Sequence, residues 1–309
     1  AAQHIVKTVR PQLVLSVDLG YSPRGELFDV CLAAGLETIT WNAAHKNNQL
    51  MLKRYSRANR DVHPASLSVR TWHDLQAQPW THAERERLRR ELVGSYLSGE
   101  WYGEVGTQFH TTLQEAAEIR RALDLDDRKK TAVIFSHIFW DGTFFYGTDL
   151  FGSYEEWFVE TMKVACANPH LNWIVKIHPA NIVKNVRDGV GSEPSELTAI
   201  RSLGETLPAH VRVVQPDSHM STLSLYSVID YCVTVRGTVG IEAACFGIPV
   251  LTAGTGRYDR LVFTIDSDSR AEYLNRLAHI QEIPSQSAAQ RVLAERFAHG
   301  VFVLRPFSL

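Results

Sequence analysis

Short apolar segments and amphipathic segments alternate along the whole chain. Near the N-terminus, an apolar run at 12–20 ends in turn residues, a helical segment at 28–35 closes with glycine, and a second apolar run follows at 37–42. Together they predict a β-α-β unit of about 31 residues, close to the minimum length for such a crossover. The chain therefore begins with an α/β pattern.

The end of this first α/β region is marked by a change in composition. Thr81 followed by Glu84 predicts a capping box that opens an amphipathic helix ending near residue 93, and a second helix is expected at 111–125. The segment 124–131 is then charged and has no apolar periodicity. We place the domain boundary there, so that the first domain is predicted to span 1–125.

The second half of the chain restarts the alternation. Apolar runs that predict buried strands occur at 131–137, 171–179, 211–216, 231–237 and 248–254. Helix-like segments separate them, among them one at 153–169 with an acidic first turn. Repeated β-α segments with short links predict a doubly wound parallel sheet, here over 126–285. The fold class is therefore α/β with two tandem Rossmann-like domains, followed by a helical segment at 286–309.

The composition is that of a globular chain. Of 309 residues, 45% are hydrophobic and 21% are charged, which excludes disorder, collagen and coiled coil. The formal net charge of −2 gives no basic field for nucleic acid. No apolar run approaches the length of a membrane span, so we expect a cytoplasmic protein whose contact with a membrane is peripheral. A start without Met indicates that the sequence begins inside a longer chain.

The first candidate site is the HP dipeptide at the end of a predicted strand. His178 follows an apolar run, Pro179 ends the strand, and Lys176 lies two residues back on the same face. An imidazole there can donate a hydrogen bond to a phosphate oxygen. A lone histidine that is satisfied by a loop carbonyl is the alternative, and spacing does not decide between them.

The second candidate site is the turn between a strand and a helix at 233–247. Here Arg236 and Gly237 end the strand, Thr238 begins the helix, and Glu242 lies one turn further on the same face. The unpaired N–H groups of a helix N-terminus bind anions, and a carboxylate accepts from the hydroxyls of a ribose. An ordinary N-cap with a solvated glutamate is the alternative. No glycine pattern of the dinucleotide-binding or Walker type is present.

The third group of candidates consists of polar residues that follow other strands. Asp18, at the end of the first strand, is a natural general base, although an Asx turn explains the same position. His45 and Asp141 are weaker candidates for the base. Tyr21, in the turn after Asp18, and His137 are assigned to the acceptor side. For His137 and Asp141, a loop residue that caps the backbone is the alternative. No metal site is predicted, because the four cysteines are widely spaced.

Several of these motifs together are similar to a known class. KIHP at 176–179, followed by TVRGTVGIEAACFGIPV at 234–250, resembles bacterial surface-polysaccharide glycosyltransferases of the GT-B fold. Capsule Kdo transferases, polysialyltransferases and CDP-glycerol glycerophosphotransferases share this HP plus Ser/Thr pattern. WNAAH at 41–45, SHIFWD at 136–141 and LFGSYEEW at 150–157 extend the resemblance over most of the chain.

The resemblance implies roles for the candidate residues. His178 and Thr238 would hold the donor phosphate, Glu242 would bind the nucleotide ribose, and 286–309 would cross back to the first domain. Arg236 departs from the smaller polar residues expected before Gly-Thr, and its charge would add a phosphate contact or alter the choice of donor. No resident cofactor is expected, since the nucleotide-sugar is a substrate.

The function implied is transfer of a sugar from a CMP- or other NDP-sugar donor to a surface polysaccharide or glycolipid, without a metal. Two alternatives remain open. A nucleotide-sugar 2-epimerase of the same fold would need no acceptor, and a catalytically silent GT-B-like module would bind nucleotide weakly or not at all. The predicted partners are the donor and a glycan or glycolipid acceptor, with peripheral association with a membrane polysaccharide assembly.

Overall fold

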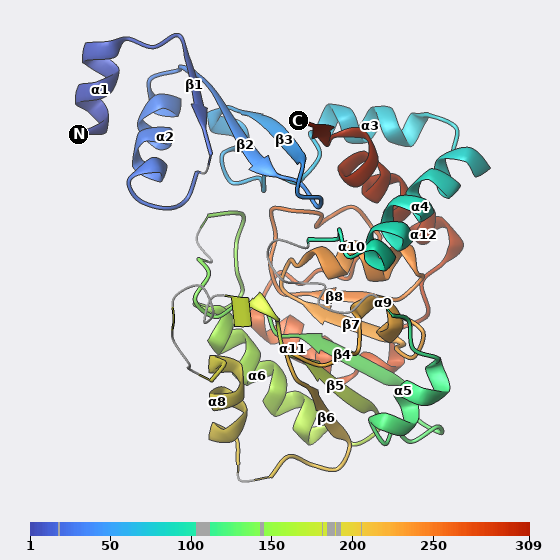
Figure 1. Ribbon diagram of the computed structural model, residues 1–309. Coiled ribbons are helices and arrows are strands. Elements are labelled where there is room, and N and C mark those ends of the chain that lie inside the picture. Colours follow the sequence, from blue (N-terminus) through green and yellow to red (C-terminus); the bar gives the residue numbers. More distant parts are fainter. Residues whose placement is uncertain are drawn as a thin grey trace.

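The chain folds around two separate β-sheets (Figure 1). The computed structural model describes residues 1–17, 19–102, 112–142, 145–180, 182–183, 189, 193–204 and 206–309. We call the part built on the four-stranded sheet the first lobe and the part built on the five-stranded sheet the second lobe. No helix within the described ranges is long and apolar enough to cross a membrane.

The first lobe contains a mixed sheet in the order β1-β2-β3-β9. Its strands are β1 (Leu13–Ser16), β2 (Glu37–Ala43), β3 (Gln49–Tyr55) and β9 (Phe307–Ser308). β1 and β2 are parallel, as the β-α-β prediction requires, but β3 runs antiparallel to β2 and was not predicted. The connection between β2 and β3 spans only 44–48, which suits a hairpin and is too short for a parallel crossover.

Helices border this sheet. They are α1 (Ala2–Val9), α2 (Arg24–Ala33), α3 (Val69–Ala77) and α4 (His82–Ser98), with a 3₁₀ turn η1 (Arg57–Asn59). α4 begins with the predicted capping box, in which the Thr81 backbone N–H donates to Glu84 Oε2 at 3.1 Å. The helix continues past the predicted end near 93, until Gly99 adopts a left-handed conformation with φ 76°.

The second lobe contains the predicted all-parallel sheet, in the order β6-β5-β4-β7-β8. Its strands are β4 (Thr131–Phe135), β5 (Asn172–Lys176), β6 (Val211–Val214), β7 (Tyr231–Thr234) and β8 (Val250–Thr252). Every residue of the central strand β4 is buried, because helices cover both faces of the sheet.

Two helical layers enclose this sheet. One contains α6 (Tyr154–Ala167), α8 (Ser195–Ser202) and α11 (Arg270–Ala278), followed by the 3₁₀ turn η3 (Ile280–Glu282); the other contains α5 (Ala116–Ala122), α9 (Thr222–Leu225) and α10 (Thr238–Cys245). Ala132 and Ile134 of β4 pack into the first layer, whereas Val133 and Phe135 pack into the second. This alternation is the period of a strand with two buried faces.

The C-terminal segment returns to the first lobe, as predicted. α12 (Ala288–His299) packs against α10 and also against α3 and α4, then continues as a π-helical turn, η4 (Gly300–Leu304), into β9 (Figure 1). Arg305 donates to the carbonyl oxygens of Ser66 at 2.9 Å and Leu52 at 3.0 Å. The last residues of the chain therefore complete the first lobe.

Candidate functional site

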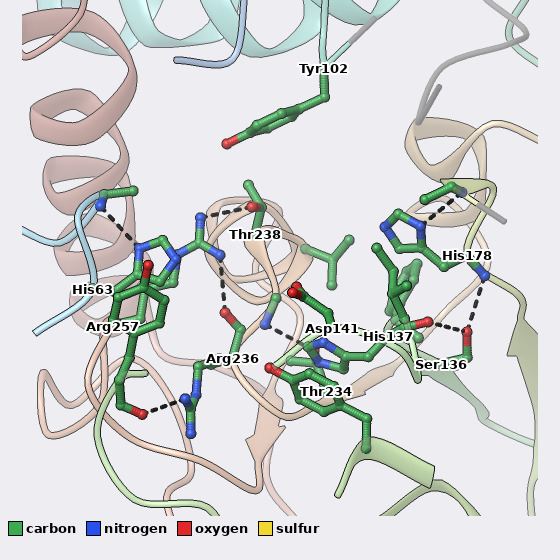
Figure 2. A pocket seen from close by; sticks show the side chains of 18 of the residues that line it. His63, Tyr102, Ser136, His137, Asp141, His178, Thr234, Arg236, Thr238 and Arg257 are labelled. Carbon is green, nitrogen blue, oxygen red and sulfur yellow. Dashed lines mark hydrogen bonds between the residues drawn. The ribbon is translucent and has the colours of Figure 1, made fainter. Parts of the chain in front are cut away.

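A pocket of about 850 Å³ is lined by residues of both lobes (Figure 2). The second lobe contributes residues that follow β4, β5 and β7, and the carboxyl ends of parallel strands are where open α/β sheets bind ligands. The first lobe contributes the end of β2, the turn at 63–65 and residues near the end of α4. No group of three His, Cys, Asp or Glu side chains among the described residues is arranged to hold a metal ion.

The N-terminus of α10 borders this pocket. Gly237 is the N-cap residue and Thr238 the first helical residue, and both line the pocket. The Gly237 N–H donates to Thr234 Oγ1 at 3.2 Å. A Cβ atom at position 237 would lie 2.9 Å from that oxygen, so the turn requires glycine. The unpaired N–H groups of the first helical turn make this edge of the pocket favourable for an anion.

Arg257 lies beside this helix end and was not predicted. Its Nη2 donates to Thr238 Oγ1 at 2.8 Å and its Nη1 to the Arg236 carbonyl oxygen at 3.2 Å. The residue is only 9% exposed, its Nε forms no hydrogen bond, and no carboxylate among the described residues forms an ion pair with it. The pocket therefore contains a nearly buried arginine that forms no ion pair with any carboxylate in the described ranges.

The structure corrects the expectation for Arg236. This side chain lines the pocket, but it is 4% exposed and its guanidinium forms an ion pair with Asp149. It also donates to the carbonyl oxygen of Tyr146. Its charge is neutralised inside the second lobe, so Arg257 rather than Arg236 is the arginine beside Thr238 that lacks an ion pair within the described part of the chain.

The HP turn after β5 also faces the pocket. His178 and Lys176 both line it, and the His178 backbone N–H donates to Ser136 Oγ at 3.1 Å. The ring Nδ1 of His178 accepts from the Ala180 N–H at 3.1 Å. Burial and, to a smaller extent, Lys176 lower the pKa of His178 to about 4, and burial lowers the pKa of Lys176 to about 8. His178 is therefore neutral at pH 7.

His137 lies beside the start of α10, next to His178. Its Nε2 accepts from the Val235 N–H at 2.9 Å, and its ring stacks on Tyr154 at 4.6 Å. Burial, helped by His178 and two arginines, lowers its pKa to about 3. Because a backbone N–H can only donate, the ring proton is on Nδ1. His137 is thus a neutral residue of the second lobe.

A third pocket histidine, His63, comes from the first lobe and was not predicted. Its backbone N–H donates to the Gly256 carbonyl oxygen at 2.7 Å, which joins the two lobes next to Arg257. Burial and then Arg257 hold its pKa well below the usual range. The signal for it was visible in the sequence, since His-Pro-Ala occurs both at 63–65 and at 178–180.

Glu242 lines the pocket, as expected of a ligand-binding residue, but its carboxylate is already bonded to other side chains. It is 2% exposed, and its carboxylate accepts hydrogen bonds from the hydroxyls of Tyr96 and Tyr226 and from the indole N–H of Trp101. Burial raises its pKa. Tyr96 and Trp101 belong to the first lobe, so the carboxylate links the lobes through hydrogen bonds that a ribose would have to replace.

The three predicted candidates for a general base have different positions. Asp141 lines the pocket, where its Oδ1 accepts from the Tyr21 hydroxyl, so these two predicted residues meet across the lobes. Asp18 lies outside the described residues. The prediction of His45 as a general base is wrong. The residue is 1% exposed, and its Nε2 lies 2.7 Å from Glu91 Oε1. The residue packs in the core beside Trp101.

Comparisons with known proteins agree with this architecture. No protein-family model matches the sequence, and no curated protein sequence matches it. A solved structure titled KpsC, beta Kdo 2,4 transferase, from Thermosulfurimonas dismutans is similar, with a TM-score of 0.53 and 14% identity. That match covers 96% of this chain and 80% of the other.

A second structure from the same organism, titled KpsC, beta Kdo 2,7 transferase, has a TM-score of 0.50 and 15% identity, over 100% of this chain and 82% of the other. At these identities the likeness shows the fold alone. The chain therefore has the GT-B fold, with two Rossmann-like domains and a C-terminal helix that crosses back to the first.

Proposed function

We propose that this protein is a glycosyltransferase, which moves a sugar from a nucleotide-activated donor to a surface polysaccharide or glycolipid acceptor. The observation that carries the proposal is Arg257, a nearly buried cation that has no ion-pair partner among the described residues and is hydrogen-bonded to Thr238 at the N-terminus of α10. A buried charge is unfavourable unless it is paired, so this site is built for an anion. The two similar structures are described as Kdo transferases.

The donor phosphate is the anion that fits this position. In the proposed complex, the N–H group of Thr238, the side chain of His178, and the charges of Lys176 and Arg257 surround the phosphate. Sugar transfer leaves negative charge on the departing phosphate, and preorganised donors stabilise that charge in the transition state. No resident cofactor is part of the proposal.

Asp141 is our candidate for the general base, with Asp18 kept as a prediction. Asp141 follows β4 and reaches the pocket, and Tyr21 of the first lobe donates to its Oδ1. A carboxylate held in this way can accept the proton of an attacking acceptor hydroxyl. Tyr21 and the neutral His137 are then placed to contact the acceptor, which comes from a membrane polysaccharide assembly that the protein meets peripherally.

The first experiment is a thermal-shift screen against CMP, CDP, UDP, GDP and ADP. We compare the wild type with His178→Ala and with His73→Ala, a matched control because the His73 side chain is 82% exposed on α3. A nucleotide at 100 times its Kd should stabilise the protein by about 2.7 kcal/mol. We expect one nucleotide to stabilise the wild type and the control but not His178→Ala.

The same variants then separate the alternatives. With donor and acceptor supplied, we expect turnover of His178→Ala to fall by about 10²–10³-fold, the loss seen on removing one donor to a developing anion. Epimer formation or nucleotide release without acceptor would instead support a 2-epimerase. If none of the five nucleotides shifts the wild type, the chain is a silent module and the proposal is wrong.

A further inference from the structure

The two His-Pro-Ala turns have the same local geometry. In the second lobe, Nδ1 of His178 accepts from the Ala180 N–H at 3.1 Å; in the first lobe, Nδ1 of His63 accepts from the Ala65 N–H at 3.0 Å. Both rings line the pocket. In Figure 2, His63 and His178 lie on opposite sides of the view. The pocket is thus bordered by two turns that share the sequence His-Pro-Ala and the same hydrogen bond to the histidine ring.

This geometry fixes the protonation of each ring. Because Nδ1 accepts from a backbone N–H, the proton of the neutral imidazole is on Nε2. Neither Nε2 has a hydrogen-bond partner among the described residues. Burial and nearby cations keep the pKa of His63 well below its usual range, so the ring is an uncharged donor at neutral pH.

The His63 turn is held in place from three sides. Lys53 Nζ donates to the carbonyl oxygens of His63 at 3.2 Å and Ser66 at 3.0 Å, and Arg305 donates to the same Ser66 oxygen at 2.9 Å. The His63 N–H donates to Gly256, the residue before Arg257. These bonds position the imidazole before any ligand arrives, which lowers the entropic penalty of binding.

The positive charges around His63 favour a negatively charged ligand. Arg257, Arg236, Lys53 and Arg305 all disfavour a positive charge on the ring. Only Arg236 among them has an acidic partner in the described chain, namely Asp149. A group that accepts from an N–H and carries negative charge fits this surrounding, whereas a cation or a hydrogen-bond donor does not.

We propose that His63 Nε2–H and Arg257 form a second anion subsite, which shares Arg257 with the His178 subsite and binds a carboxylate or phosphate oxygen. The inference rests on the proposed function, because it requires one of the substrates of sugar transfer to carry a second negatively charged group. That group belongs either to the transferred sugar, as in a nucleotide-linked sugar acid, or to the end of the acceptor glycan.

Two variants of each histidine test the subsite. His63→Asn retains an acceptor near the position of Nδ1 for the Ala65 N–H but removes the outer donor, whereas His63→Gln retains a donor near the position of Nε2. The matched pair at the other turn is His178→Asn and His178→Gln. Thermal shift with inorganic phosphate at constant ionic strength then tests the subsite without any nucleotide.

We expect two phosphate sites in the wild type, one in each single Asn variant and none in the double variant, with His63→Gln restoring the site. Phosphate titration of His63→Asn that is indistinguishable from the wild type would overturn the inference. This readout does not depend on nucleotide binding, so it separates failure of the subsite from failure of the proposed transferase activity.

The source of the anion is found with the nucleotide that the screen identifies. We expect His63→Asn to change the Kd of that nucleotide by no more than about twofold. Binding of the substrate that carries the anion, either the sugar donor or the acceptor, should weaken by tenfold or more, as for a lost hydrogen bond to a charged group. A raised Kd for CMP-Kdo but not for UDP-GlcNAc assigns the anion to the sugar. A raised KM for acceptor alone assigns it to the acceptor, and no change in either contradicts the inference.

Discussion

Arg236 and Asp149 form an ion pair inside the second lobe, with side chains that are 5% and 13% exposed. The pair neutralises the arginine that directly precedes the α10 turn. Arg257, which bonds to the Arg236 carbonyl oxygen, has no such partner among the described residues. Of the two neighbouring guanidinium groups, one therefore supports the fold and the other is available to a ligand.

Removing one member of the Arg236–Asp149 ion pair should strongly destabilise the fold. Asp149→Asn leaves a buried guanidinium uncompensated, and we expect the free energy of unfolding to fall by about 3–5 kcal/mol. Urea denaturation measures this. In the double variant Arg236→Met/Asp149→Asn the loss should be smaller than in Asp149→Asn alone; a larger loss would show that the pair is not the cause.

Substitution of Arg257 should affect the binding of nucleotide more than the stability of the fold. In Arg257→Met, lost hydrogen bonds are offset by removal of a buried charge, so we expect the free energy of unfolding to change by about 1 kcal/mol or less. The Kd of the nucleotide should rise by tenfold or more, measured by titration calorimetry. Arg257→Lys keeps the charge and serves as the control. Unchanged affinity in Arg257→Met would remove Arg257 from the phosphate site.

Glu242 predicts a stability change that separates its two roles. Glu242→Gln replaces one of two acceptor oxygens with a donor that faces tyrosine hydroxyls, so we expect a loss of about 1.5–3 kcal/mol of unfolding free energy. Binding of nucleotide is measured on the same samples. Loss of stability with unchanged Kd identifies a link between lobes, whereas a higher Kd at unchanged stability identifies the ribose ligand.

The pocket histidines predict a pH dependence of stability. His178 has a pKa of about 4 in the folded protein, below the usual 6.5, so between these values the unfolded chain binds a proton that the folded chain does not. Its contribution is present above pH 6.5 and is lost as pH falls, by about 1.4 kcal/mol per pH unit. Glu242, with its raised pKa, acts in the opposite sense.

A difference between variants isolates this effect. Urea denaturation of the wild type and of His178→Gln at pH 7.0, 6.0 and 5.0 should show that the variant loses less stability per pH unit on acidification. Parallel curves for the two proteins would contradict the low pKa of His178.

Much of the second lobe could be predicted because its signals are local. Each buried strand, and the sequence of strand, glycine and helix around Gly237, is contained in about 15 neighbouring residues. His45 was wrong for the opposite reason. Its partner, Glu91, is 46 residues away, and nothing near His45 shows that the ring turns into the core.

The missed residues depend on contacts between distant segments. Arg257 follows the strand predicted at 248–254, but nothing in the sequence shows that it reaches Thr238. It does so because Gly256, at φ 92°, allows its loop to approach Gly147 and the first lobe. His63 was recognisable as a repeat of His-Pro-Ala, but its place in the pocket follows from the bond between its N–H and Gly256. Both roles arise only when the lobes meet.

The return of the C-terminus has a consequence for synthesis of the protein. Strands β1 to β3 of the first lobe are translated before the second lobe, yet β9, Arg305 and the aromatic ring of Phe302 that packs beside His45 and Trp101 are translated after it. A nascent first lobe therefore lacks part of its core until residues 302–308 have left the ribosome. The last strand of the second sheet ends at Thr252, so the second lobe can fold earlier. It then offers a folded surface on which the first lobe completes its assembly.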